Sequence, residues 1–268
     1  MRRPSHFVFT AALLLAGLLA KAQTPAPAYT GPRYPGGPDS LRALLYRSSR
    51  VAPTKAKELV VLRLELKADH TPGTFRVVGD QQGPKSAAGR ATAAAQAYLQ
   101  AHMPAWEAGT PSAQVKPGKN STFLLPLNFT APLSAQPYAY ADQEPVFAYV
   151  DYARPPRNVA FDDNADAAAV MARIEAAYNS SFVAYIQRQT RYPAEALRNQ
   201  QQGRVLVYFE VAENGTVENP QILASAGSAL DNEVLGAVRR LQPASTPAQL
   251  QGKPVRVFYV LPISFKIQ

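Results

Sequence analysis

The chain has 268 residues, enough for two domains and a linker. Its composition, 47% hydrophobic and 18% charged with 24 prolines, is that of a folded protein with extra linker content. The absence of cysteine excludes disulfides, thiolate chemistry and cysteine-based metal sites. The net charge of +9 comes without clustered runs of lysine and arginine, which argues against nucleic acid as a partner.

The N-terminus has the pattern of a secretory signal peptide. A pair of arginines precedes an apolar run from Phe7 to Ala20, and small residues at Ala20 and Ala22 mark a cleavage site. We therefore expect residues 1–22 to be removed after Ala22 and the protein to reach the periplasm. The alternative is an uncleaved inner-membrane anchor, although the run is shorter than the roughly 20 residues of a spanning helix. Residues 23–38 form a proline-rich linker.

The last third of the chain begins with two short predicted helices. Phe182, Tyr185 and Ile186 are spaced as one face of a helix. This helix must end at Tyr192-Pro193, because the residue before a proline is pushed out of the helical region. A second helix over residues 193–199 can start there, since proline suits the first helical turn.

A β-hairpin is predicted next. Val205, Val207, Phe209 and Val211 alternate with Leu206, Tyr208 and Glu210, which indicates a strand with one fully apolar face. Asn214-Gly215 is a strong hairpin-turn signal because both residues tolerate positive φ. The returning strand covers Val217 to Leu223. Its Pro220 lacks an amide donor and is expected at an edge or bulge.

A helix and a β-rich stretch complete the chain. Apolar residues recur at helical spacing from Leu230 to Leu241. Residues Lys253 to Ile267 alternate as a strand that Pro262 interrupts. The order of elements predicts an α+β fold, a three-stranded antiparallel sheet with a helix packed on one face. So small a sheet has an edge nearby whose free amide and carbonyl groups can accept a peptide strand.

Together these elements resemble the TonB C-terminal domain, in the variant common in Bacteroidetes. The resemblance covers residues 181–268 and rests on several motifs in the expected order. These motifs are Tyr192-Pro193-Ala194-Glu195-Ala196, Gly203-Arg204-Val205, Glu213-Asn214-Gly215-Thr216-Val217, Leu230-Asp231, Gly252-Lys253-Pro254-Val255 and Leu261-Pro262-Ile263-Ser264-Phe265.

The resemblance implies a periplasmic domain that captures the TonB box peptide of a TonB-dependent outer-membrane transporter by β-strand addition. It places the receiving edge on the last strand, and Tyr192-Pro193 beside the groove. The partner-binding residues that it implies are Tyr192, Pro193, Val255, Arg256, Val257, Phe258, Tyr259, Val260 and Leu261. The alternatives are that Tyr192-Pro193 only separates two helices, and that the strand serves the core.

Residues 39–130 repeat this pattern in a degenerate form, so we expect the fold to be present twice. The alternating run Val60 to Leu66 parallels Val205 to Val211, and Leu125-Pro126-Leu127-Asn128-Phe129 parallels the last motif above. An alanine-rich helix is predicted from Ala87 to about His102, and Trp106 is expected in the core.

The connecting segment, residues 131–180, carries two further patterns. Glu144 to Val150 could add a strand, and residues 165–178 should be helical. The acidic cluster at Asp162, Asp163 and Asp166 invites a calcium interpretation, but it lacks the glycine and terminal glutamate of an EF-hand loop. Helix N-capping is the better account.

No catalytic pattern is found. The mature chain contains only His70 and His102, and neither lies in a recognised motif. We therefore expect a binding protein without enzymatic activity, cofactor or metal. The alternative function is an envelope scaffold that forms homodimers or binds peptidoglycan. A complete energy transducer would need a retained membrane helix and a longer spacer than residues 24–38, which reach about 47 Å.

Overall fold

The structure, a computed structural model, describes residues 28–52, 59–79, 86–109, 121–149 and 180–267. The predicted signal peptide, the acidic cluster and the predicted helix over residues 165–178 lie outside these ranges. Across the described ranges, no helix combines the length and apolar character needed to cross a membrane.

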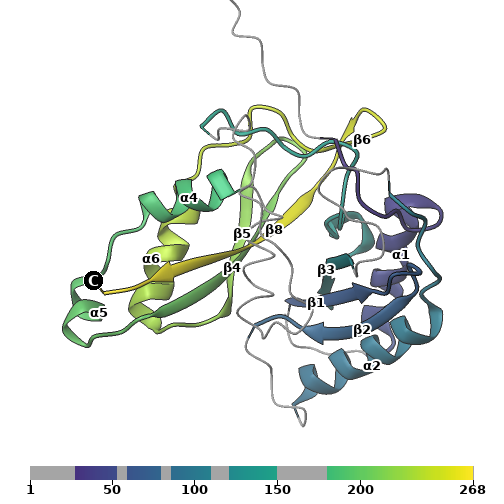
Figure 1. Cartoon of the computed structure of the whole chain (residues 1–268), viewed down its shortest axis with the longest axis horizontal. Helices are drawn as coiled ribbons and strands as arrows, with labels where there is room; N and C mark the ends of the chain where they lie inside the picture. The colour runs from purple at the N-terminus through teal and green to yellow at the C-terminus, as the bar shows by residue number, and fades with distance from the viewer. Residues whose placement is uncertain (1–27, 53–58, 80–85, 110–120, 150–179, 268) are drawn as a thin grey trace, which may run out of the picture.

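The first module is a three-stranded antiparallel sheet with two helices on one face (Figure 1). Its strands lie in the order β2-β1-β3. Leu44 and Leu99 of the helices pack with Leu62 and Leu125 of the sheet. Trp106, only 4% exposed, closes this core as expected. The elements are α1 (Gly37–Arg50), β1 (Leu59–Leu66), β2 (Pro72–Val77), α2 (Ala87–His102) and β3 (Ser121–Asn128).

The second module confirms the predicted α+β fold. Its main sheet is antiparallel in the order β5-β4-β8, and α4 and α6 pack on one face (Figure 1). The elements are α4 (Ser180–Gln189), α5 (Ala194–Arg198), β4 (Gly203–Val211), β5 (Val217–Ala224), α6 (Ser228–Arg239), β6 (Gln249–Leu250), β7 (Lys253–Pro254) and β8 (Val257–Phe265). A 3-10 turn, η1 (Leu133–Ala135), lies between the modules in sequence.

The two sheets pack face to face. Along β4, Val205, Val207 and Phe209 point to the helices of the second module. The alternate residues Leu206 and Tyr208 point the other way and join a separate core between the sheets. That core contains Val61, Val78, Leu124, Leu206, Tyr208, Phe258 and Val260. The layers are therefore helices, sheet, sheet, helices, as Figure 1 shows.

Both sheets place their strands in the same order, hairpin strand, central strand and last strand. A proline occupies an equivalent register position in each last strand. Pro126 lies opposite Val61, and Pro262 lies opposite Leu206. These shared features support the expected repeat, which stays a prediction.

Three details differ from the sequence-based expectations or refine them. β8 begins at Val257, so Val255 and Arg256 precede the strand, and it continues through Pro262 without interruption. A bulge in β5 accommodates Pro220, as predicted, because the register shifts between Tyr208 and Glu210 of β4. The stretch from Glu144 contributes a single β-bridge at Val146 rather than a strand.

Candidate functional site

The last strand of the second module pairs with another strand on one side only. β8 is hydrogen-bonded to β4, and on its other side the described residues add an isolated parallel β-bridge between Tyr138 and Val257 but no further strand. In an antiparallel pair, backbone groups alternate between pointing toward the partner and away from it. Ser264 and Arg256 make backbone hydrogen bonds away from β4. Phe258, Val260 and Pro262 are separated from these residues by even numbers of positions. Their backbone groups therefore also point away from β4.

The side chains of β8 are divided between two cores. Val257, Tyr259 and Leu261 pack with α4 and α6. Phe258 and Val260 pack between the two sheets. Val260 and Leu261 have no exposed surface, and within β8 only Ser264 is half-buried rather than buried. β8 is therefore largely buried in this structure, so a pairing strand has to displace whatever covers its outer side.

Tyr192 and Pro193 lie at the far end of this strand. The Tyr192 ring packs against Phe265, with ring centroids 5.5 Å apart and planes at 82°. Its hydroxyl donates to the Gln201 carbonyl. Pro193 caps the N-terminus of α5. The structure thus brings Tyr192 beside the end of β8, about four residues, or roughly 13 Å, beyond Leu261.

A pocket of about 420 Å³ opens at the same end of the sheet. It is lined by Gln202, Gly203, Arg204, Ser264, Phe265 and Lys266. Two of these side chains are basic and none is acidic. The pocket therefore has a largely apolar surface whose charged lining residues are both basic, next to the edge residue Ser264.

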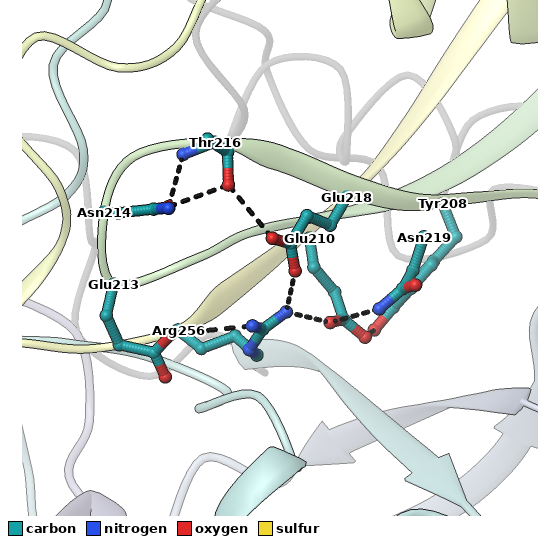
Figure 2. Close-up of polar contacts among 8 residues, drawn as sticks. All are labelled: Tyr208, Glu210, Glu213, Asn214, Thr216, Glu218, Asn219 and Arg256. Carbon is teal, nitrogen blue, oxygen red and sulfur yellow. Dashed lines mark hydrogen bonds and ion pairs between the residues drawn. The ribbon is translucent and has the colours of Figure 1, made fainter.

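Arg256, predicted to lie on the receiving edge, instead extends into a charge cluster (Figure 2). Its Nη1 atom is 2.9 Å from Glu210 and 2.8 Å from Glu218, and its Nη2 atom is 3.5 Å from Glu213. The hydrogen bond from Arg256 is the main reason that the pKa of Glu218 lies below its ordinary value. The side chain of Arg256 therefore ties the β4–β5 hairpin to the start of β8.

Glu210 is the buried member of this cluster, at 3% exposure. Besides Arg256, it accepts hydrogen bonds from the Tyr208 hydroxyl at 2.7 Å and the Asn219 amide at 2.9 Å (Figure 2). Burial raises the pKa of Tyr208 well above its ordinary value, so its hydroxyl stays protonated and donates. Asn219 has positive φ of 52° in the β5 bulge, which turns its side chain toward Glu210.

A second carboxyl group touches β8 itself. The Glu144 side chain lies 3.3 Å from the Tyr259 hydroxyl, which donates to it. The residue as a whole is half-buried, but its carboxyl group is enclosed, and desolvation by burial raises its pKa. The hydrogen bond from Tyr259 acts in the opposite direction. The pKa of Glu144 therefore depends on its burial and on its contact with Tyr259 of β8.

Sequence reasoning missed the residues that close the edge of β8. Gln187 of α4 bonds to Ser264, and Tyr138 bonds to Arg256. Alternation along the strand identifies which β8 residues point outward, but it carries no information about residues far away in the chain. One signal was available for Gln187. Phe182 and Ile186 form an apolar stripe that fixes which side of α4 meets the sheet, and thereby which helix residues lie near β8.

The comparison with protein families identifies the second module. Residues 188–267 match the family model described as Gram-negative bacterial TonB protein C-terminal. The match does not extend to β1, β2, α2 or β3 of the first module. No curated protein matches the chain.

Two solved structures are similar to part of the chain. An NMR structure of the TonB C-terminal domain of Helicobacter pylori is 24% identical, with a TM-score of 0.26, over 32% of this chain and 90% of that one. The structure of the HasB C-terminal domain is 30% identical, with a TM-score of 0.23, over 44% of this chain and 92% of that one. On the family match, residues 188–267, which contain α5, β4, β5, α6 and β8, belong to the TonB C-terminal domain family.

Proposed function

We propose that this protein is a periplasmic binding module that engages the TonB box peptide of an outer-membrane transporter by β-strand addition along β8. The observation that carries the proposal is that β8 pairs with only one strand, β4, while on its outer side the described residues add an isolated parallel β-bridge between Tyr138 and Val257 and no strand. Backbone hydrogen bonds give an added peptide strand its affinity, while side-chain pockets give it specificity.

The family assignment supports the same partner class. TonB-like domains interact with outer-membrane transporters, and the matched residues include the whole of β8. The proposed contact surface comprises Phe258, Val260 and Pro262 on the edge, with Tyr192, Pro193 and the pocket at Ser264 beside its end. Val257, Tyr259 and Leu261 position the strand through the core, and Val255 and Arg256 hold its start. This role involves no catalysis.

Titration with a synthetic TonB-box peptide, followed by NMR, tests the proposal. We expect the largest amide shifts at Phe258 and Val260, together with new interstrand contacts from the peptide to these residues. Absence of binding, or shifts confined to the first module, would contradict the proposal. Sedimentation in the same buffer distinguishes the scaffold alternative, since an edge strand can also pair with a second copy.

A further inference from the structure

Gln187 makes two hydrogen bonds to one residue of the β8 edge. Its Nε2 atom donates to the Ser264 carbonyl at 2.8 Å, and its Oε1 atom accepts from the Ser264 amide at 3.0 Å. A side-chain amide offers both a donor and an acceptor, as a backbone does. Gln187 thus satisfies the two groups of Ser264 that a pairing strand would satisfy.

The other end of the edge is closed by the chain as well. The Tyr138 amide donates to the Arg256 carbonyl at 2.8 Å. Tyr138 is fixed in turn by α1, because its hydroxyl lies 2.6 Å from Asp39 and the Arg42 guanidinium lies 4.1 Å from its ring centroid. This closure depends on two modules, whereas the closure at Ser264 depends on one side chain.

Between these two ends the edge is short. The outward-directed backbone groups here belong to Phe258, beside the Tyr138–Val257 bridge, to the buried Val260, and to Pro262, which has a carbonyl alone because proline has no amide hydrogen. Beyond Pro262, the next outward residue is Ser264, which also lines the pocket at the end of the sheet. Rotation of the Gln187 side chain would free both groups of Ser264 and join the edge to that pocket.

We infer that Gln187 is a built-in competitor of the partner peptide, occupying Ser264 in the free protein and limiting the length of β8 that a peptide can pair with. This inference rests on the proposed function. It adds that a bound peptide must either stop before Ser264 or displace Gln187. The side chain of Gln187 therefore sets the balance between a protected edge and an available one.

The test compares Gln187→Ala with Gln189→Ala in the full chain. Gln189 is exposed two residues further along α4, and among the described contacts only its backbone carbonyl is used, by Arg240. In the free protein we expect faster hydrogen exchange of the Ser264 amide in Gln187→Ala. With a synthetic TonB-box peptide that reaches Ser264, we expect affinity to rise about tenfold, because two hydrogen bonds no longer have to be broken. Gln189→Ala should match the wild type in both measurements.

The variant Gln187→Glu provides a second measurement if Gln187→Ala lowers the stability of α4. It keeps an acceptor for the Ser264 amide and loses the donor to the carbonyl, so a smaller gain in affinity is expected. If the wild type binds the peptide and Gln187→Ala binds it no more tightly than the wild type does, the competitor role is overturned. The proposed function is then left intact. Unchanged exchange at Ser264 would also overturn the competitor role. Failure of every protein to bind would instead reject the proposed function and the inference with it.

Discussion

The guanidinium of Arg256 and the carboxylate of Glu210 form the most buried ion pair of the second module, with Nη1 and Oε2 2.9 Å apart and side chains 17% and 4% exposed. Because Glu210 lies in β4 and Arg256 just before β8, the pair joins the central strand to the start of the last one. A buried charge of this kind depends on its partner, since removing either leaves the other uncompensated.

Arg256→Met should therefore destabilise the protein strongly. The loss is expected to be about 3–5 kcal/mol in the free energy of unfolding, measured by urea denaturation at pH 7. Arg239→Met, at an exposed position in the last turn of α6, is the control and should stay within about 0.5 kcal/mol of the wild type. Equal effects of the two substitutions would show that the Arg256 cluster contributes no more than an ordinary surface charge.

The core between the sheets makes a second prediction, on cooperativity. Leu206 is 6% exposed and packs in that core with residues of both modules. Leu206→Ala should cost about 2–4 kcal/mol and shift one calorimetric transition that includes both modules. The exposed Leu133→Ala should leave the transition unchanged. Two separate transitions, with only one shifted by Leu206→Ala, would contradict the shared core.

The fold of the second module was accessible from its sequence because its signals are local. The alternation of Val205 to Val211 fixed both faces of β4, and Asn214-Gly215 fixed the hairpin. The predicted strand began at Lys253, four residues before β8, because alternation continues through Val255 and Arg256. In the structure, the Val255 amide bonds to the Ala248 carbonyl and the Arg256 side chain forms ion pairs, so both residues lie outside β8. The sequence pattern also treated Pro262 as a break, whereas its missing amide faces away from β4 and costs no ladder bond.

The candidate site was less accessible because it is closed by distant residues. Gln187 and Tyr138 meet β8 only after the chain folds, and neither belongs to a motif. The packing of the two sheets also had no sequence signal beyond the apolar second face of β4. Leu206 and Tyr208 lie on that face, and nothing in the alternation identifies the first module as the element that covers them.

A third prediction concerns Gly79, which follows β2 and approaches β5. A Cβ atom at this position would lie 2.1 Å from the Leu223 carbonyl oxygen, and φ is +89°. Gly79→Ala should therefore cost clearly more than Gly252→Ala, where φ is +76° and nothing lies within 4 Å of the added atom. We expect about 1 kcal/mol for Gly252→Ala from backbone strain alone, and at least twice that for Gly79→Ala, in thermal denaturation. Equal losses would show that the contact between Gly79 and β5 is readily relieved.

The last prediction concerns the pH dependence that Glu144 gives to the protein. Burial raises the pKa of its carboxyl group in the folded state, so the folded protein favours the protonated form. Its contribution to stability is complete below the ordinary pKa of a glutamate and is lost as pH rises through the folded-state value. Glu144→Gln should therefore match the wild type near pH 4 and be more stable than it at pH 8, in urea unfolding at a series of pH values.

Asp142 acts in the opposite direction, because a hydrogen bond from the Gln251 amide lowers its pKa, but it is present in both proteins and cancels in the difference. A constant difference across the series, as expected for the exposed control Glu195→Gln, would show that the Glu144 carboxyl is ordinarily solvated beside Tyr259.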